Sequence, residues 1–77
     1  MNNKSISNIV GSMLDEIFTI QSNKITGIYK IVIREVEKVL INKVMKFTNY
    51  NKKLSAKILG ISRNTLDSKI KILDLKL

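Results

Sequence analysis

The sequence predicts an all-α fold, a four-helix subunit that ends in a helix-turn-helix. Apolar residues recur at steps of three and four along most of the 77-residue chain, which is the spacing of one helix face. Within residues 51–73, two such stretches are separated by a short corner, Gly60 to Ser62, where one helix ends and another begins. A chain of this length forms one domain, so we treat residues 1–77 as a single unit.

The first predicted helix covers about residues 5–21. Its apolar side chains lie three or four residues apart, which predicts one buried face. The polar segment 22–26 that follows is long enough to reverse the chain direction. Either Thr26 or Ser22 is placed to cap the second helix. The apolar face of the first helix consists of Ile6, Ile9, Val10, Met13, Leu14, Ile17 and Ile20.

The second predicted helix, at about residues 27–48, is the longest, and it is apolar around most of its circumference. A surface helix normally buries one stripe, and a short chain cannot cover two. The sequence therefore predicts a homodimer, with one stripe in the subunit core and the other against a partner chain. The alternative is that β-branched residues simply accumulated on a tolerant face. The stripes are Ile28, Val32, Val36, Val39, Leu40 and Phe47, and Tyr29, Ile33, Ile41, Val44 and Met45.

The segment 51–73 predicts the helix-turn-helix. Asn51 is a good N-cap for its first helix, and Gly60 tolerates the positive φ with which a helix ends. Ser62 supplies an oxygen to cap the second helix, and the small Ala56 lets the two helices approach closely. The predicted core positions are Leu54, Ile58 and Leu59 before the corner, and Leu66, Ile70 and Leu73 after it.

The charge of the chain indicates a polyanionic partner. The formal net charge is +8, of which residues 47–77 carry +5. A lysine-rich surface that only keeps a small protein in solution is the simpler alternative. The chain has neither His nor Cys, which argues against a zinc site and against Ser-His or Cys-His catalysis. No acid/base pair or phosphate-binding loop stands out either, so we expect no metal, no cofactor, no small-molecule ligand and no enzyme activity. No apolar run reaches the length of a membrane span, so we expect no membrane contact and a cytoplasmic location on the nucleoid.

Two contiguous segments carry a recognisable pattern, IYKIVIREVEKVLINKVMKFTNYN (28–51) and KKLSAKILGISRNTLDSKIKIL (52–73). The chain resembles the Fis family in three successive motifs. These are Glu-Val-Glu-x-x-Leu, Val-Met-x-Phe-Thr-x-x-Asn and Ala-x-x-Leu-Gly-Ile-Ser-Arg-x-Thr-Leu. That family includes the factor for inversion stimulation and the C-terminal domains of NtrC-type activators. The resemblance implies an intertwined homodimer that binds and bends double-stranded DNA. Its two recognition helices lie closer than one DNA turn, so the duplex bends and its central minor groove narrows.

By position, the resemblance also implies DNA contacts. Arg63 matches a residue that reaches a guanine edge, and Asn51 and Thr65 match residues that hold phosphates. The lysines are expected to contact the backbone without reading sequence. Simpler alternatives remain: Arg63 is only solvated, Asn51 only caps, or Thr65 only caps or fills space. The full set of expected DNA-binding residues is Asn51, Lys52, Lys53, Ser62, Arg63, Asn64, Thr65, Lys69 and Lys71.

Two positions depart from the pattern. Asp67 and Ser68 occupy sites that are basic in the factor for inversion stimulation, and Asp67 has the wrong sign for a neighbour of phosphate. These positions give some support to an alternative function, a protein-interaction module whose helix-turn-helix is only structural. A cationic membrane-surface peptide is a third interpretation, disfavoured because the basic residues cluster around the helix-turn-helix. The sequence thus predicts a dimeric DNA-binding and DNA-bending regulator or nucleoid-associated protein.

Overall fold

A computed structural model describes residues 5–20 and 26–77, and within those ranges the chain is entirely helical apart from turns. The helices are α1 (Ile6–Ile20), α2 (Ile28–Phe47), α3 (Lys52–Leu59) and α4 (Arg63–Ile72). The predicted all-α architecture of four helices is confirmed, and the predicted bounds agree to within about one residue. Gln21 and Ser22 lie outside the described residues. None of the described helices has an apolar stretch long enough to cross a bilayer.

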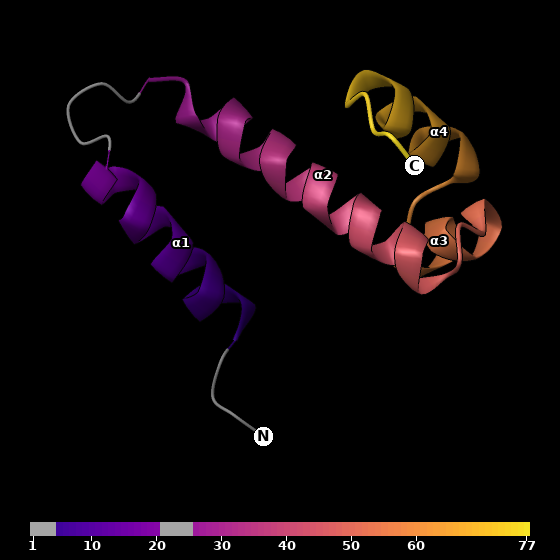
Figure 1. The fold of residues 1–77 in the computed structure, drawn as a ribbon, viewed down its shortest axis with the longest axis horizontal. Helices are drawn as coiled ribbons and strands as arrows, with labels where there is room; N and C mark the ends of the chain where they lie inside the picture. The colour runs from indigo at the N-terminus through magenta and orange to yellow at the C-terminus, as the bar shows by residue number, and fades with distance from the viewer. Residues whose placement is uncertain (1–4, 21–25) are drawn as a thin grey trace.

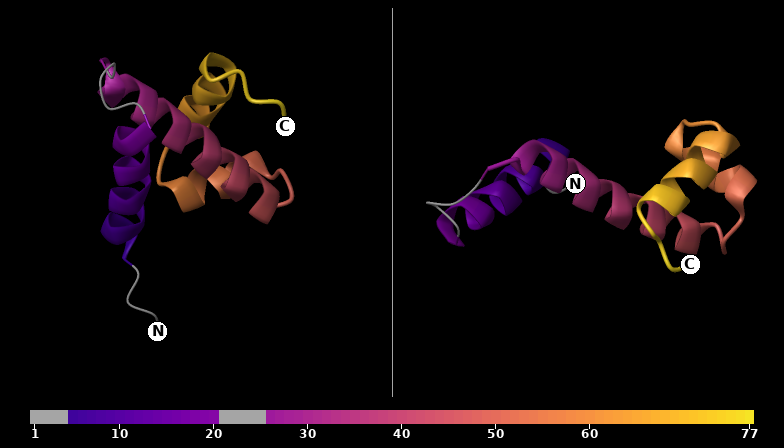
Figure 2. Two further views of the ribbon diagram at one scale, coloured as in Figure 1. Left: turned by 60° about the vertical axis from the view of Figure 1, so that its left-hand side comes forward. Right: turned by 90° about the horizontal axis from the view of Figure 1, so that it is seen from above.

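Helix α2 connects the two ends of the molecule (Figure 1). Helix α1 runs antiparallel beside the first part of α2, whereas α3 and α4 gather at its C-terminal end. The right-hand view of Figure 2 shows the same division from above, with α1 well separated from α3 and α4. The radius of gyration is 14.8 Å, compared with about 11.5 Å for a compact chain of this length. The subunit is therefore extended, with its helix-turn-helix at one end.

The helices begin with different caps. The Ser5 Oγ atom accepts a hydrogen bond from the Asn8 backbone N–H at 3.1 Å at the start of α1. Helix α2 begins at Gly27, which has a φ of 68° and makes no side-chain cap bond. The prediction that Thr26 caps α2 is therefore wrong. The left-handed backbone of Gly27 turns the chain into α2 instead, a conformation that glycine adopts without steric cost.

The core lies where α2, α3 and α4 meet. Its buried side chains come from all three helices and from the residue that ends α4, and partly buried Leu59, Ile61, Ile70 and Leu75 pack against them. Leu54 and Ile58 were expected in this core, but they are 43% and 48% exposed. Helix α3 instead turns its neighbouring face inward, the face that carries Ser55 and Ala56. The buried apolar residues are Ile41, Met45, Ala56, Leu66 and Leu73.

A buried polar contact closes the corner between α2 and α3. The Thr48 and Ser55 hydroxyl oxygens lie 2.6 Å apart, and the Ser55 side chain is fully buried. Thr48 Oγ1 also accepts from the Asn51 backbone N–H at 3.2 Å. Asn49 and Tyr50 between them have positive φ values of 56° and 65°. Because two non-glycine residues are held in this conformation, the hydroxyl pair and its neighbours fix the angle at which α3 leaves α2.

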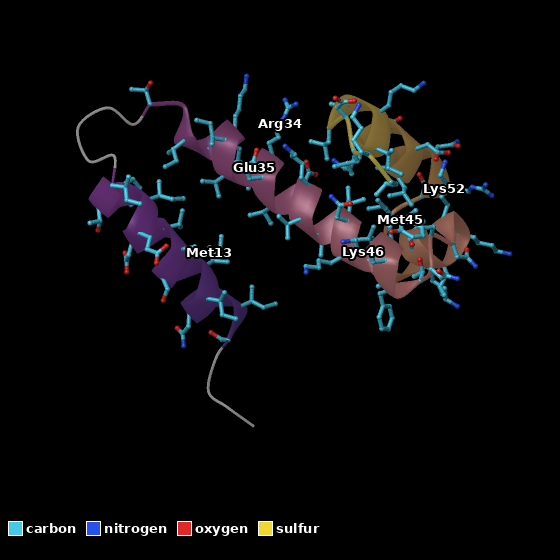
Figure 3. All side chains as sticks on the ribbon, in the orientation of Figure 1. Met13, Arg34, Glu35, Met45, Lys46 and Lys52 are labelled. Carbon is cyan, nitrogen blue, oxygen red and sulfur yellow. The ribbon has the colours of Figure 1, made fainter. Side chains whose placement is uncertain are left out.

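An apolar groove lies between α1 and α2. No residue of α1 is buried, so this helix has no core of its own within the subunit. The groove has a volume of about 390 Å³, and its accessible lining is apolar. Figure 3 shows Met13 on the side of α1 that faces α2. The main lining residues are Val10, Met13, Leu14 and Ile17 from α1, and Ile31, Val32, Val36, Val39 and Leu40 from α2.

Candidate nucleic-acid interface

The corner between α3 and α4 is held by backbone and side-chain caps. Gly60 ends α3 with a φ of 76°, and its N–H donates to the Ala56 carbonyl oxygen at 2.9 Å. The Ile61 N–H donates to the same carbonyl at 3.0 Å. The Ser62 Oγ atom accepts from the Thr65 N–H at 3.0 Å and caps α4. The predicted roles of Gly60 and Ser62 in this corner are therefore confirmed.

The N-terminus of α3 is capped as the sequence predicted. Asn51 Oδ1 accepts from the Leu54 N–H at 3.0 Å, and the Asn51 side chain is exposed. A cap oxygen leaves other amides at the helix N-terminus unsatisfied, so this end can still receive an anion. Capping by Asn51 and contact with a phosphate are thus compatible in this geometry.

Helix α4 buries one face and presents the other. Leu66 is fully buried and Ile70 is packed against the core. The first turn of α4, with Arg63, Asn64 and Thr65, is exposed. Thr65 Oγ1 accepts a hydrogen bond from the Ser62 hydroxyl at 2.9 Å. The side chains expected to touch DNA at the start of α4 therefore lie together beyond the capped corner.

The cations of this region fall into two groups. Lys53, Arg63 and Lys71 are exposed and make no ion pair with any residue that the structure describes. Lys57, which was not among the expected DNA-binding residues, shares these properties. Such side chains have all their hydrogen-bond donors available to an external anion.

Lys52 and Lys69 already have anionic partners. The Lys69 ammonium lies 2.6 Å from Glu37 Oε2, and this ion pair joins α4 to α2. The Lys52 ammonium lies 2.9 Å from Asp67 Oδ1 and joins α3 to α4. Figure 3 shows Lys52 at the junction of these two helices. Sequence reasoning missed both pairs, because partners 15 and 32 residues apart share no helical repeat.

The charge on Asp67 is stabilised by its surroundings. The pKa of its carboxyl group is lowered from the ordinary value of 3.8, chiefly by Lys52 and further by Arg63 and Lys71, while partial burial opposes the change. Asp67 is consequently ionised at neutral pH and subtracts one charge from a surface that is otherwise cationic.

The capped corner, the buried Ala56 and Leu66, and the exposed cationic start of α4 define a helix-turn-helix protein. Residues 32–72 match the family described as bacterial regulatory protein, Fis family. The chain belongs to the Fis family. This finding confirms the resemblance seen in the sequence, and the matched residues include most of α2 together with α3 and α4.

Individual relatives agree with this assignment. The chain is 30% identical over 63 residues to DNA-binding protein Fis of Vibrio cholerae and of Vibrio vulnificus, a match that covers 82% of this chain and 64% of each relative. It is 44% identical over 50 residues to DNA-binding transcriptional regulator NtrC of Azospirillum brasilense, covering 65% of this chain and 10% of the relative. The chain thus spans less than two thirds of the length of these relatives.

Proposed function

We propose that this chain is a DNA-binding protein that acts as a dimer, bends its target, and serves as a transcription regulator or a nucleoid-associated protein. The observation that carries the proposal is the exposed, cationic first turn of α4, held on a rigid helix-turn-helix whose opposite face is buried. A helix presented in this way fits the major groove of B-DNA. The proposal places the protein on chromosomal DNA in the cytoplasm.

Within the proposed complex, the exposed residues divide into one base reader and several backbone contacts. The Arg63 guanidinium is shaped to pair with guanine N7 and O6. Asn51, Ser62, Asn64 and Thr65 are placed around the two helix N-termini, where phosphates bind. The side chains of Lys53, Lys57 and Lys71 are expected to neutralise phosphates without reading sequence. One strong base reader per subunit predicts a degenerate site.

The dimer is supported by the amount of surface that the subunit leaves exposed. A compact monomer of 8.8 kDa exposes about 4,800 Å², whereas this chain exposes 6472 Å². The excess of about 1,700 Å² per chain corresponds to about 3,400 Å² for a pair, which lies in the range of obligate dimers. The apolar groove between α1 and α2 is the part of the surface best suited to a second copy.

Bending follows from the proposed dimer, in which two copies of α4 lie closer together than one DNA turn. Inserting both into successive major grooves requires the duplex to curve and its central minor groove to narrow. Smooth bending costs about 1–6 kcal/mol, and flexible sequences lower that cost. The proposal therefore predicts an A/T-favouring centre that no side chain touches, flanked by a guanine and its complement.

Titration of labelled duplex DNA by fluorescence anisotropy tests this function. If six or more phosphates are neutralised, affinity falls about 10³–10⁵-fold between about 50 and 200 mM salt. Lys71→Ala removes one proposed phosphate contact, so it should reduce the slope of log affinity against log salt by about 0.9. Lys30→Ala, at the far end of α2, is its charge-matched control and should leave the salt dependence nearly unchanged. A protein that binds no duplex, even at the lowest salt concentration, would instead favour a protein-interaction module.

A substitution in the groove tests the dimer separately. Val36→Asp places a charge among apolar lining residues, so it should shift the mass in solution from two chains to one. Ile72→Asp is the matched control, because Ile72 is exposed and lies outside the groove. Equal masses for the two variants would show that the groove is not the contact between copies.

A further inference from the structure

Asp67 lies in the middle of the cationic face of α4. Arg63, Asp67 and Lys71 are spaced four residues apart, and this spacing puts three side chains in one row on a helix. The row begins at the proposed base reader and continues to a proposed phosphate contact. A carboxylate between two cations in such a row has no obvious place on a surface that binds a polyanion.

The partner of Asp67 comes from the other helix of the motif. Lys52, the first residue of α3, places its ammonium nitrogen 2.9 Å from Asp67 Oδ1. The Lys52 and Asp67 side chains are 44% and 46% exposed, so the pair lies at the surface where it can open. Oδ1 itself is covered and has no hydrogen-bond partner among the described residues. An ion pair between two half-exposed side chains is worth little in water, so a phosphate can displace the carboxylate from Lys52.

From this arrangement we infer that Asp67 limits the affinity of the protein for DNA, because its carboxylate competes with phosphate for the Lys52 ammonium. This inference rests on the proposed function and adds an intramolecular control to it. In the free protein the pair neutralises one cation of the interface. On DNA, Lys52 either stays with Asp67 or transfers to a phosphate and leaves the carboxylate facing the backbone, and both states weaken binding.

Asp67→Asn tests the inference, since it removes the charge and keeps the size and shape of the side chain. Freeing Lys52 adds about one phosphate contact, so affinity for any duplex should rise about five- to tenfold at about 100 mM salt. The slope of log affinity against log salt should steepen by about 0.9. A purely structural role for Asp67 would leave that slope unchanged.

Two further variants make the comparison specific. Asp15→Asn is the matched control, because Asp15 is an exposed carboxylate on α1, a helix that lies away from α3 and α4. It makes the same change in net charge and should alter affinity less than twofold. Lys52→Gln should weaken binding in the original chain, because it leaves the Asp67 carboxylate unpaired, and in the Asp67→Asn chain it should cancel the gain in affinity.

The outcomes separate this inference from the function on which it rests. If the original chain binds DNA and Asp67→Asn binds with the same affinity and salt slope, the competition is refuted and the proposed function stands. Equal gains in affinity from Asp67→Asn and Asp15→Asn would mean that only the net charge matters, which would also refute the competition. If neither the original chain nor Asp67→Asn binds any duplex, the proposed function fails and the inference fails with it.

Discussion

Thr48→Val is the substitution whose effect the structure defines most sharply. Valine keeps the branched shape of threonine and removes only the hydroxyl group. That hydroxyl lies 2.6 Å from Ser55 Oγ and accepts from the Asn51 N–H. It also lies 3.2 Å from the Met45 carbonyl oxygen, to which it is placed to donate. The substitution therefore removes the centre of the polar contact that joins α2 to α3.

The expected loss of stability depends on which hydrogen-bonding groups the substitution leaves without a partner. The Asn51 N–H keeps a second acceptor, the Thr48 carbonyl oxygen at 3.3 Å. Ser55 is fully buried and loses its side-chain partner, so it supplies most of the cost. A buried hydroxyl left unpaired costs about 1–3 kcal/mol. For a domain of this size, that loss lowers the midpoint of thermal unfolding by roughly 4–24 °C.

A double-mutant cycle followed by circular dichroism at fixed chain concentration measures this contact. Ser55→Ala alone should cost about 0.5–1.5 kcal/mol, because Thr48 keeps its other partners. In the double variant no hydroxyl is left unpaired, so its loss should be smaller than the sum of the two single losses by about 1 kcal/mol. Thr19→Val, which removes an exposed hydroxyl on α1, is the control and should stay within about 0.5 kcal/mol. Strictly additive losses would refute the buried contact.

Three further predictions test other contacts of the helix-turn-helix. Arg63→Ala should weaken specific binding by roughly 1–3 kcal/mol and flatten the preference at one base pair; an unchanged preference in a panel of substituted duplexes would exclude base reading. In a double-mutant cycle, Glu37→Gln and Lys69→Met should show a coupling of about 0.5–1 kcal/mol in the free energy of unfolding. The coupling is small because both side chains are about one-third exposed to solvent. The absence of coupling would mean that the pair does not hold α4 to α2. Because the pKa of Asp67 is lowered, chiefly by Lys52, its pair stabilises the fold at neutral pH and is lost as pH falls through that lowered pKa. Lys52→Gln should raise the midpoint of the Asp67 carboxyl titration by NMR toward 3.8, and an unchanged midpoint would contradict the pair.

Local signals in the sequence predicted the helix-turn-helix accurately. Gly60 ends α3 and Ser62 caps α4 because both roles depend on one residue's backbone or side chain and its near neighbours. Leu66 and Leu73 are buried as the helical spacing predicted. The four helices followed from the same periodicity, so the fold class and most of the element bounds were accessible without coordinates.

The sequence was less informative where two helices meet. It did not show that α3 packs through Ser55, because a serine in an amphipathic pattern is usually assigned to the outer face. Leu54 and Ile58 were expected in the core because they are apolar and lie at helical spacing, but the structure leaves both exposed. The ion pairs of Lys52 and Lys69 depend on the angle of α4 against α3 and α2. Such contacts are set by tertiary packing, so no spacing rule within one helix reveals them.

The central claim is that two copies of this chain join through α1 and α2 and present two α4 helices to one duplex. Sedimentation equilibrium tests it directly, with the protein alone and with a duplex of about 30 base pairs, roughly three helical turns. We expect twice the chain mass of 8.8 kDa for the free protein and two chains on each duplex in the complex. A free protein of 8.8 kDa that binds DNA as one chain would contradict the claim.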